Sequence, residues 1–244
     1  MLAKSSGIIG IKITLLIYTP MPLDFESFTL AAATADLAEE PDAREHADAV
    51  EFRMDLADSP VAAFEEYDGE LPLIATNRAE WEGGEASNEG RIDALETAVG
   101  YDAVEAVDIE LASLNEGDGR DLLNAAADHD VSVIVSTHDF EETPSKAELD
   151  RLLTEAREYG DVAKLAVTAH DPDDTLALLE TTRRHAAQGD PVATMSMGPV
   201  GGHTRAVAVV YGSRIGYAPV DPEKATAPGQ YDVETLRQLV EQLS

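Results

Sequence analysis

The sequence predicts a (β/α)₈ barrel that occupies residues 21–244 as one domain. Eight short apolar runs alternate with longer amphipathic or charged segments, as the strands and helices of such a barrel do. Several of the runs are rich in Val and Ile with little polar alternation, which is typical of strands buried on both faces. An open, doubly wound sheet is the alternative that this pattern leaves.

The predicted strands are the apolar runs at residues 28–33, 49–52, 71–76, 104–109, 131–136, 162–167, 192–195 and 215–218. The helical spacing of apolar residues predicts three of the helices, over residues 144–159, 172–187 and 232–243. We expect Thr143 and Asp171 to cap the first two of these helices, because a proline follows each of them at the first helical position.

The chain is strongly acidic, since 48 Asp and Glu residues against 17 Lys and Arg residues give a formal net charge of −31. Such a charge repels phosphates and anionic lipids, so we expect neither nucleic acid nor a membrane surface as a partner. Concentrated salt screens the repulsion, and the composition therefore indicates a cytoplasmic protein of a salt-accumulating organism. The chain has no cysteine for a disulfide or a thiolate metal site, and its six histidines lack metal-ligand spacing.

Residues 1–20 differ in character from the rest of the chain. Their apolar run, residues 8–18, contains Lys12 and is too short to span a bilayer. We expect an extension that is poorly ordered or lies outside the barrel core. A weak signal peptide is the alternative, although no small-residue cleavage site clearly follows.

Lys164 lies inside an apolar predicted strand, in a chain that has only five lysines, and we expect its amine to lie within a nonpolar wall. Burial of an ammonium group lowers its pKa toward the range in which the free amine is a nucleophile, as a Schiff-base lysine requires. A structural lysine that pairs with a carboxylate is an equal alternative. His138 directly follows the preceding predicted strand, where an imidazole could transfer protons near Lys164. Its alternative is a loop histidine beside Asp139 with no chemical task.

Charged residues also end the second, third and fourth predicted strands. Strand alternation places Glu51 and Arg53 on one face, either for binding or as an internal ion pair. Arg78 and Glu82 precede a Gly-Gly pair, and a solvated loop pair is their alternative. The acidic residues of the segment DIE (108–110) could orient a lysine or an arginine, although structural pairing is favoured.

Arg205 follows three glycines after the seventh predicted strand, and Gln230 lies in the loop before the last helix. An arginine can bind a carboxylate through two parallel hydrogen bonds, and a glutamine can add an amide contact. Without a further argument, ordinary surface positions are favoured for both residues.

Taken together, seven motifs of the chain resemble those of the type I 3-dehydroquinate dehydratases. In chain order they are EFRMD (51–55), the segment with Arg78, Glu82 and Gly84, THDF (137–140), KLAV (164–167), SMGPVGGHTR (196–205), GS (212–213) and APGQ (227–230). Any one motif is weak, but their order and spacing across nearly the whole chain after Met21 are highly specific.

The resemblance implies a (β/α)₈ barrel that removes water from 3-dehydroquinate to give 3-dehydroshikimate in the shikimate pathway. The family works without a metal, no other cofactor is expected, and a homodimer is common. By this resemblance, Lys164 would attack the ketone and form an imine, and His138 would be the general acid and base. Glu82 would orient or tune His138.

The resemblance also implies two groups of substrate-binding residues: Glu51, Arg53 and Arg78 for the ring hydroxyls, and Arg205 and Gln230 for the carboxylate. Thr226 stands where family members commonly carry serine, and its hydroxyl can make the same hydrogen bond. The first strand matches the family poorly, so it is assigned no site residue.

Two other interpretations come from different classes. Another imine-forming barrel, such as a class I aldolase, would share Lys164. It gives no reason for Glu51, Arg53, Arg205 and Gln230 to occur together. A non-catalytic, ligand-binding barrel descended from such an enzyme is the second interpretation.

Overall fold

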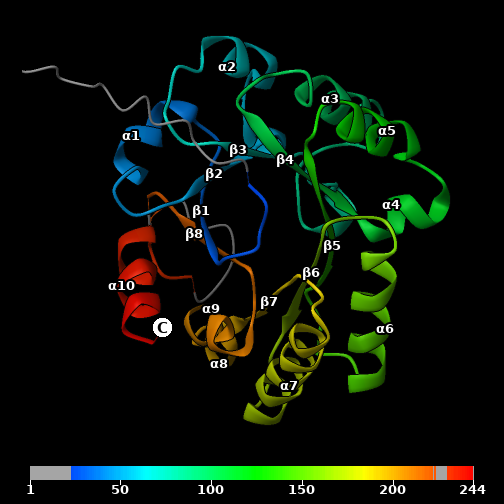
Figure 1. The fold of residues 1–244 in the computed structure, drawn as a ribbon, viewed down its shortest axis with the longest axis vertical. Helices are drawn as coiled ribbons and strands as arrows, with labels where there is room; N and C mark the ends of the chain where they lie inside the picture. Colours follow the sequence, from blue (N-terminus) through cyan, green and yellow to red (C-terminus); the bar gives the residue numbers. More distant parts are fainter. Residues whose placement is uncertain (1–22, 222, 224–229, 244) are drawn as a thin grey trace, which may run out of the picture.

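Eight parallel strands form one sheet in the order β7-β6-β5-β4-β3-β2-β1-β8 (Figure 1). The structure is a computed structural model, and it describes residues 23–221, 223 and 230–243. Sequential strands are neighbours throughout and β8 pairs with β1, which confirms the barrel and excludes the open, doubly wound sheet. The strands are β1 (Thr29–Thr34), β2 (Ala49–Arg53), β3 (Leu73–Thr76), β4 (Val104–Glu110), β5 (Ser132–Asp139), β6 (Val162–Thr168), β7 (Val192–Met197) and β8 (Ile215–Pro219).

The seam between β7 and β8 is closed by the residues that precede β8. Val192 and Ser213 form an isolated parallel bridge, and the Arg214 N–H donates to the Val192 carbonyl at 2.7 Å. The Ser213 hydroxyl accepts the Thr194 N–H at 3.0 Å. The eight strands therefore surround a common interior.

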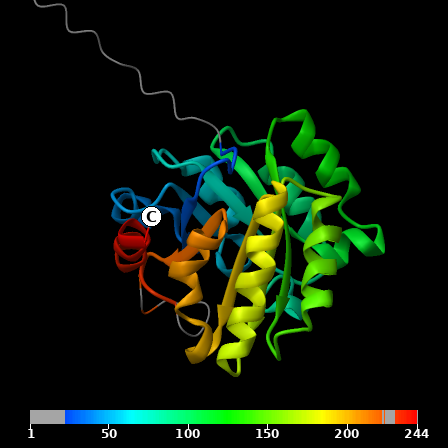
Figure 2. The ribbon, with the colours of Figure 1, turned by 60° about the horizontal axis from the view of Figure 1, so that its bottom comes forward.

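Helices cover the outside of the barrel (Figure 1), and Figure 2 shows α6 and α7 side by side against the strands. The α-helices are α1 (Glu40–Ala43), α2 (Pro60–Glu66), α3 (Arg91–Ala98), α4 (Leu111–Glu116), α5 (Arg120–Asp128), α6 (Lys146–Arg157), α7 (Pro172–Gln188), α8 (Gly198–Gly201), α9 (Thr204–Val207) and α10 (Val233–Leu243). Four 3₁₀ turns accompany them among the described residues: η1 (Leu37–Glu39), η2 (Met54–Leu56), η3 (Glu80–Glu82) and η4 (Ala208–Tyr211).

The three predicted helices correspond to α6, α7 and α10, and one of the two predicted caps is correct. Asp171 caps α7 in a capping box with Asp174, and its carboxylate accepts the N–H groups of the first turn. The prediction for Thr143 is wrong, because Ser145 caps α6. The Thr143 hydroxyl instead donates to the Thr168 carbonyl at 2.8 Å and holds the loop before α6 to the end of β6.

Strand alternation decides which side chains enter the barrel. In β6, Val162 and Ala166 belong to the interior cluster, whereas Leu165 and Val167 pack in the layer between strands and helices. Lys164 is two residues away from each of these inward residues, so its side chain also points into the barrel.

β5 is longer at its C-terminal end than the apolar run predicts. It continues to Asp139, and His138 pairs with Ala166 within the strand instead of following it. The apolar run ends at residue 136, before the strand does, because residues near the mouth of the barrel face a polar pocket and not the core.

The opposite end of the barrel is closed by the first described residues. Phe25 is buried in the interior cluster, and Leu23 packs against that cluster. The Leu23 N–H donates to Glu105 at 2.7 Å and its carbonyl accepts the Ser132 hydroxyl at 3.0 Å. Access to the interior is therefore from the C-terminal ends of the strands.

Two predictions concern residues that the structure does not describe: the extension over residues 1–20 and the substrate contact of Thr226. Within the described part of the chain, no helix is long and apolar enough to cross a membrane.

Candidate active site

A pocket opens at the C-terminal ends of the strands, where catalytic groups of (β/α)₈ barrels are found. It is lined by eight of the nine predicted site residues, which come from strands and loops far apart in the sequence: Glu51, Arg53, Arg78, Glu82, His138, Lys164, Arg205 and Gln230. The ninth, Thr226, lies outside the described residues. The surface positions favoured for Arg205 and Gln230 on sequence alone are therefore wrong.

The amine of Lys164 lies in an acidic environment and not in a nonpolar wall. Its Nζ donates to Asp108 Oδ2 at 2.8 Å and lies 3.8 Å from Glu51 Oε1. The side chain is only 5% exposed. The prediction of apolar surroundings holds for the strand neighbours of Lys164 but fails at the end of its side chain, because inward positions of β2 and β4 carry carboxylates at this level.

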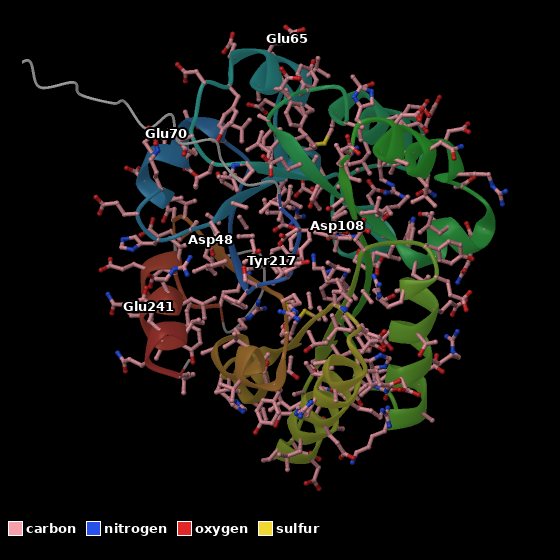
Figure 3. All side chains as sticks on the ribbon, viewed as in Figure 1. Asp48, Glu65, Glu70, Asp108, Tyr217 and Glu241 are labelled. Carbon is pink, nitrogen blue, oxygen red and sulfur yellow. The ribbon has the colours of Figure 1, made fainter. Side chains whose placement is uncertain are left out.

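Asp108 is held as a carboxylate by a fully buried network. It accepts from Arg78 at 2.6 Å and from the Ser136 hydroxyl at 2.6 Å, in addition to Lys164. Burial alone would raise the pKa of Asp108, but the charges of Arg78 and Lys164 and these hydrogen bonds lower it far below its usual range. Figure 3 shows Asp108 inside the ring of strands, whereas Asp48 and Glu241 lie at the periphery.

Glu110 anchors the other side of the Arg78 guanidinium. Its Oε1 accepts from Arg78 at 2.9 Å and its Oε2 accepts from Arg91 at 2.6 Å. The register places Glu110, Ser136 and Lys164 in one row across β4, β5 and β6. Arg78 is thus fixed by two carboxylates, which excludes the solvated loop pair that was its alternative.

His138 and Glu82 form the second cluster of the pocket. Glu82 Oε1 accepts the His138 backbone N–H at 2.6 Å and lies 3.3 Å from Nδ1. Burial and the charges of Arg78 and Lys164 lower the pKa of His138 well below its usual range, so the imidazole is neutral at neutral pH. A carboxylate that faces Nδ1 favours the tautomer with the proton on Nδ1 and leaves Nε2 as the base.

Burial raises the pKa of Glu82 to about 7, despite the opposing charge of Arg78. The Gly-Gly pair explains how Glu82 reaches this position. Gly83 has a left-handed φ of 80°, and a Cβ on Gly84 would lie 2.0 Å from the Arg78 carbonyl oxygen. Only glycine lets the chain turn this closely against Arg78.

Arg205, from α9, presents a buried guanidinium with an unmet hydrogen-bonding capacity. It is 5% exposed, and its Nε is buried with no hydrogen-bond partner among the described residues. Burial lowers the pKa of Arg205 to about 10. A cation held in a pocket in this way favours an anionic ligand.

Glu51 and Arg53 both face the pocket, as alternation predicts, while Phe52 packs on the outside. They do not form the internal ion pair that was their alternative. Arg53 donates to both oxygens of Asp55, at 2.8 and 2.6 Å, and Glu51 accepts the Thr76 hydroxyl at 3.1 Å.

Sequence reasoning missed five apolar or aromatic residues of the pocket: Phe140, Ala166, Met195, Met197 and Tyr217. The Lys164 Nζ lies 4.2 Å from the centroid of the Tyr217 ring. In sequence such residues look like core residues, and only strand alternation from Ile215 could have indicated that Tyr217 points inward. In the described ranges, no three His, Asp or Glu side chains form a group that could hold a metal ion.

The chain is similar to a known protein family and to named archaeal enzymes. A sequence profile described as type I 3-dehydroquinase matches residues 27–244. The 3-dehydroquinate dehydratase of Haloarcula marismortui is 58% identical over 225 residues, which cover 91% of this chain and 98% of that protein. The enzyme of the same name from Halobacterium salinarum is 51% identical over 225 residues, with coverage of 91% and 100%. Both are halophilic archaea, in agreement with the acidic composition.

Solved structures give the same result. The crystal structure of 3-dehydroquinate dehydratase from Geobacillus kaustophilus matches with a TM-score of 0.78 at 28% identity, and covers 89% of this chain and 91% of that one. The type I enzyme from Clostridium difficile, with covalently modified comenic acid, matches with a TM-score of 0.79 at 26% identity and coverage of 89% and 92%. The profile match and the identity to the archaeal relatives lead to one conclusion: the chain belongs to the type I 3-dehydroquinase family.

Proposed function

We propose that this protein removes water from 3-dehydroquinate to give 3-dehydroshikimate, as a shikimate-pathway enzyme. The observation that carries the proposal is that the Lys164 amine lines one pocket with His138 and the buried guanidinium of Arg205. The substrate is a hydroxylated ring with a ketone and a carboxylate. An amine can condense with the ketone, and a guanidinium can bind the carboxylate.

Lys164 begins the reaction by forming an imine. Its ammonium group first gives up a proton to the neutral imidazole of His138, and the lone pair of the neutral amine adds to the ketone carbon. A proton moves from the nitrogen to the former ketone oxygen to give the carbinolamine. The imidazolium then returns its proton to that hydroxyl group, which leaves as water and gives a protonated imine with the positive charge on Nζ. This imine withdraws electrons from the neighbouring carbon, and a C–H bond there becomes acidic.

His138 carries the proton transfers. Its neutral imidazole accepts the proton from that C–H bond through Nε2, and the electron pair of the bond forms an enamine. The enamine expels the ring hydroxyl, which leaves as water with the proton from His138. Water then hydrolyses the second imine and frees Lys164, so each turnover loses one water overall. Glu82 positions His138 through the contact at Nδ1.

The remaining residues bind the substrate in two groups. Arg205 and Gln230 hold the carboxylate, and the unmet hydrogen-bonding capacity of Arg205 supports this role. Thr226 adds its hydroxyl in the same group. Glu51, Arg53 and Arg78 hold the ring hydroxyls, and the pairing of both arginines with carboxylates supports a fixed geometry for this face.

Residues 21–244 act as the catalytic domain in this proposal, with residues 1–20 as an extension outside it. The family profile begins at residue 27, which supports this division. The enzyme works in the cytoplasm, as the composition of a salt-accumulating organism suggests.

Lys164 should be the site of covalent attachment. Borohydride reduction in the presence of 3-dehydroquinate should add the mass of the reduced ligand to the wild-type chain, and a peptide map should place it on Lys164. Lys164→Ala should lose both adduct and turnover, because among the described residues Lys164 is the one lysine that lines the pocket. Lys146→Ala is the matched control, since Lys146 is exposed and pairs with Glu180 on the outer surface. An adduct that persists in Lys164→Ala would refute the imine.

The ionisation of Glu82 should control the acid limb of the pH profile. Its raised pKa means that Glu82 is about half ionised near pH 7, protonated below that pH and ionised above it. The value of kcat/KM should therefore fall as pH decreases through about 7, because a protonated Glu82 no longer holds the Nδ1 proton of His138. In Glu82→Gln this limb should disappear and the rate should be lower throughout. An unchanged limb in that variant would count against the role of Glu82.

Arg205→Ala should chiefly weaken substrate binding. Loss of hydrogen bonds to a charged group should raise KM about 10- to 100-fold, while kcat changes much less. Arg120→Ala removes the same charge from an exposed position on α5 and serves as the control. If KM stays the same in Arg205→Ala, the carboxylate is bound elsewhere.

The active form is a homodimer in this proposal, and its contact face is the apolar patch of Leu176, Val210 and Tyr211. Leu176 is 60% and Val210 56% exposed, α7 contacts η4, and Leu176 and Tyr211 line one hollow between them. Lys146 and Arg183 lie beside the patch and balance the charges of Asp173 and Glu180 there. The wild-type protein should sediment as a dimer and Val210→Asp as a monomer. Val61→Asp, at an exposed position on α2, should remain dimeric. A wild-type monomer would contradict the proposal.

A further inference from the structure

We infer that the aromatic ring of Tyr217 is a catalytic group, which stabilises the positive charge on Lys164 Nζ after the imine has formed. The inference rests on the imine chemistry proposed above. It assigns a task to a residue that the mechanism otherwise leaves unused.

The geometry is that of a cation above a ring face. Nζ lies 4.2 Å from the centroid of the Tyr217 ring, within the range of about 6 Å in which such an attraction acts. Both side chains are buried, with exposed fractions of 5% for Lys164 and 4% for Tyr217. The attraction is therefore little screened by water. Figure 3 shows Tyr217 inside the ring of strands, where β8 presents it toward the pocket.

The ring keeps its attraction to Nζ when the imine forms, whereas the carboxylates lose hydrogen bonds from Nζ. An ammonium group has three N–H bonds to donate, and one of them reaches Asp108. A protonated imine keeps a single N–H bond, because the double bond to carbon replaces the other two. Hydrogen bonding to Nζ therefore decreases when the imine forms. The attraction to a ring face needs no N–H bond and depends only on the charge, which stays on Nζ and the adjoining carbon.

The charge at Nζ also alternates during turnover. It is positive in the imine before and after loss of the hydroxyl group, and it is neutral in the enamine between them. A ring fixed in β8 stabilises both cationic imines and leaves the neutral enamine unaffected. We therefore expect the ring to increase the amount of imine relative to enamine.

The hydroxyl group of Tyr217 is not required for this role. It is buried and has no hydrogen-bond partner among the described residues, so Tyr217→Phe should fold normally while it keeps the ring face. Phenylalanines that carry one, two or three fluorine atoms have nearly the same shape as phenylalanine, but each fluorine withdraws electron density from the ring face. This series changes the electrostatics of the ring and leaves the packing almost constant.

The test is a brief borohydride pulse on enzyme equilibrated with 3-dehydroquinate and its product, read by intact mass. Tyr217→Phe should trap about as much imine as the wild type. The ratio of imine to enamine should then fall stepwise with each added fluorine, where imine is the adduct trapped by the pulse and enamine the additional adduct trapped after protonation in acid. It should be about 5- to 30-fold lower in Tyr217→Leu, which lacks a ring.

The outcomes distinguish a failure of the imine mechanism from a failure of the role assigned to Tyr217. If the wild type is not trapped at all, the imine mechanism itself fails. If the wild type is trapped and the fluorinated series shows no trend, the mechanism stands and the inference about Tyr217 is overturned. The series decides the question even if Tyr217→Leu does not fold, because the fluorinated variants retain the ring.

Discussion

The ion pair between Lys164 and Asp108 is the interaction on which the rest of the site depends. A lysine and an aspartate are placed deep in a barrel, where an unpaired charge would be strongly unfavourable. The pair is surrounded by hydrogen bonds that involve Arg78, Ser136 and Glu110. Each charge therefore meets an opposite charge at hydrogen-bonding distance. Removal of one partner from such a buried network typically costs about 3–5 kcal/mol. The same contacts that stabilise the barrel therefore also orient the amine for chemistry.

Strand alternation explains most of what could be predicted from the sequence. It predicts the inward direction of Glu51 and Arg53 and the position of Lys164 within β6, because both follow from a period of two. It cannot predict which carboxylate reaches the amine, since that depends on the stagger between β4, β5 and β6. For this reason the pairing of Asp108 with Lys164 replaces the expected nonpolar surroundings.

The errors at element ends have a common physical cause. The apolar run of β5 stops before His138, because strand residues at the mouth face a polar pocket and lose their apolar signature. Thr143 has a good capping side chain, but its hydroxyl bonds to the Thr168 carbonyl at the end of β6, and Ser145 takes the cap. In both places a tertiary contact, which local sequence does not contain, decides the outcome. Tyr217 was missed for a related reason, since an aromatic residue in a buried strand is typical of a core.

The most direct measurement of the central claim follows the ketone oxygen. Formation of an imine on Lys164 expels that oxygen, and hydrolysis puts an oxygen from water in its place. In water enriched with oxygen-18, product formed by the enzyme should therefore carry the heavy isotope in its carbonyl group in every turnover, above the level of an enzyme-free exchange control. If the product keeps the original carbonyl oxygen, the ketone never condenses with the amine, and the account of Lys164 is contradicted.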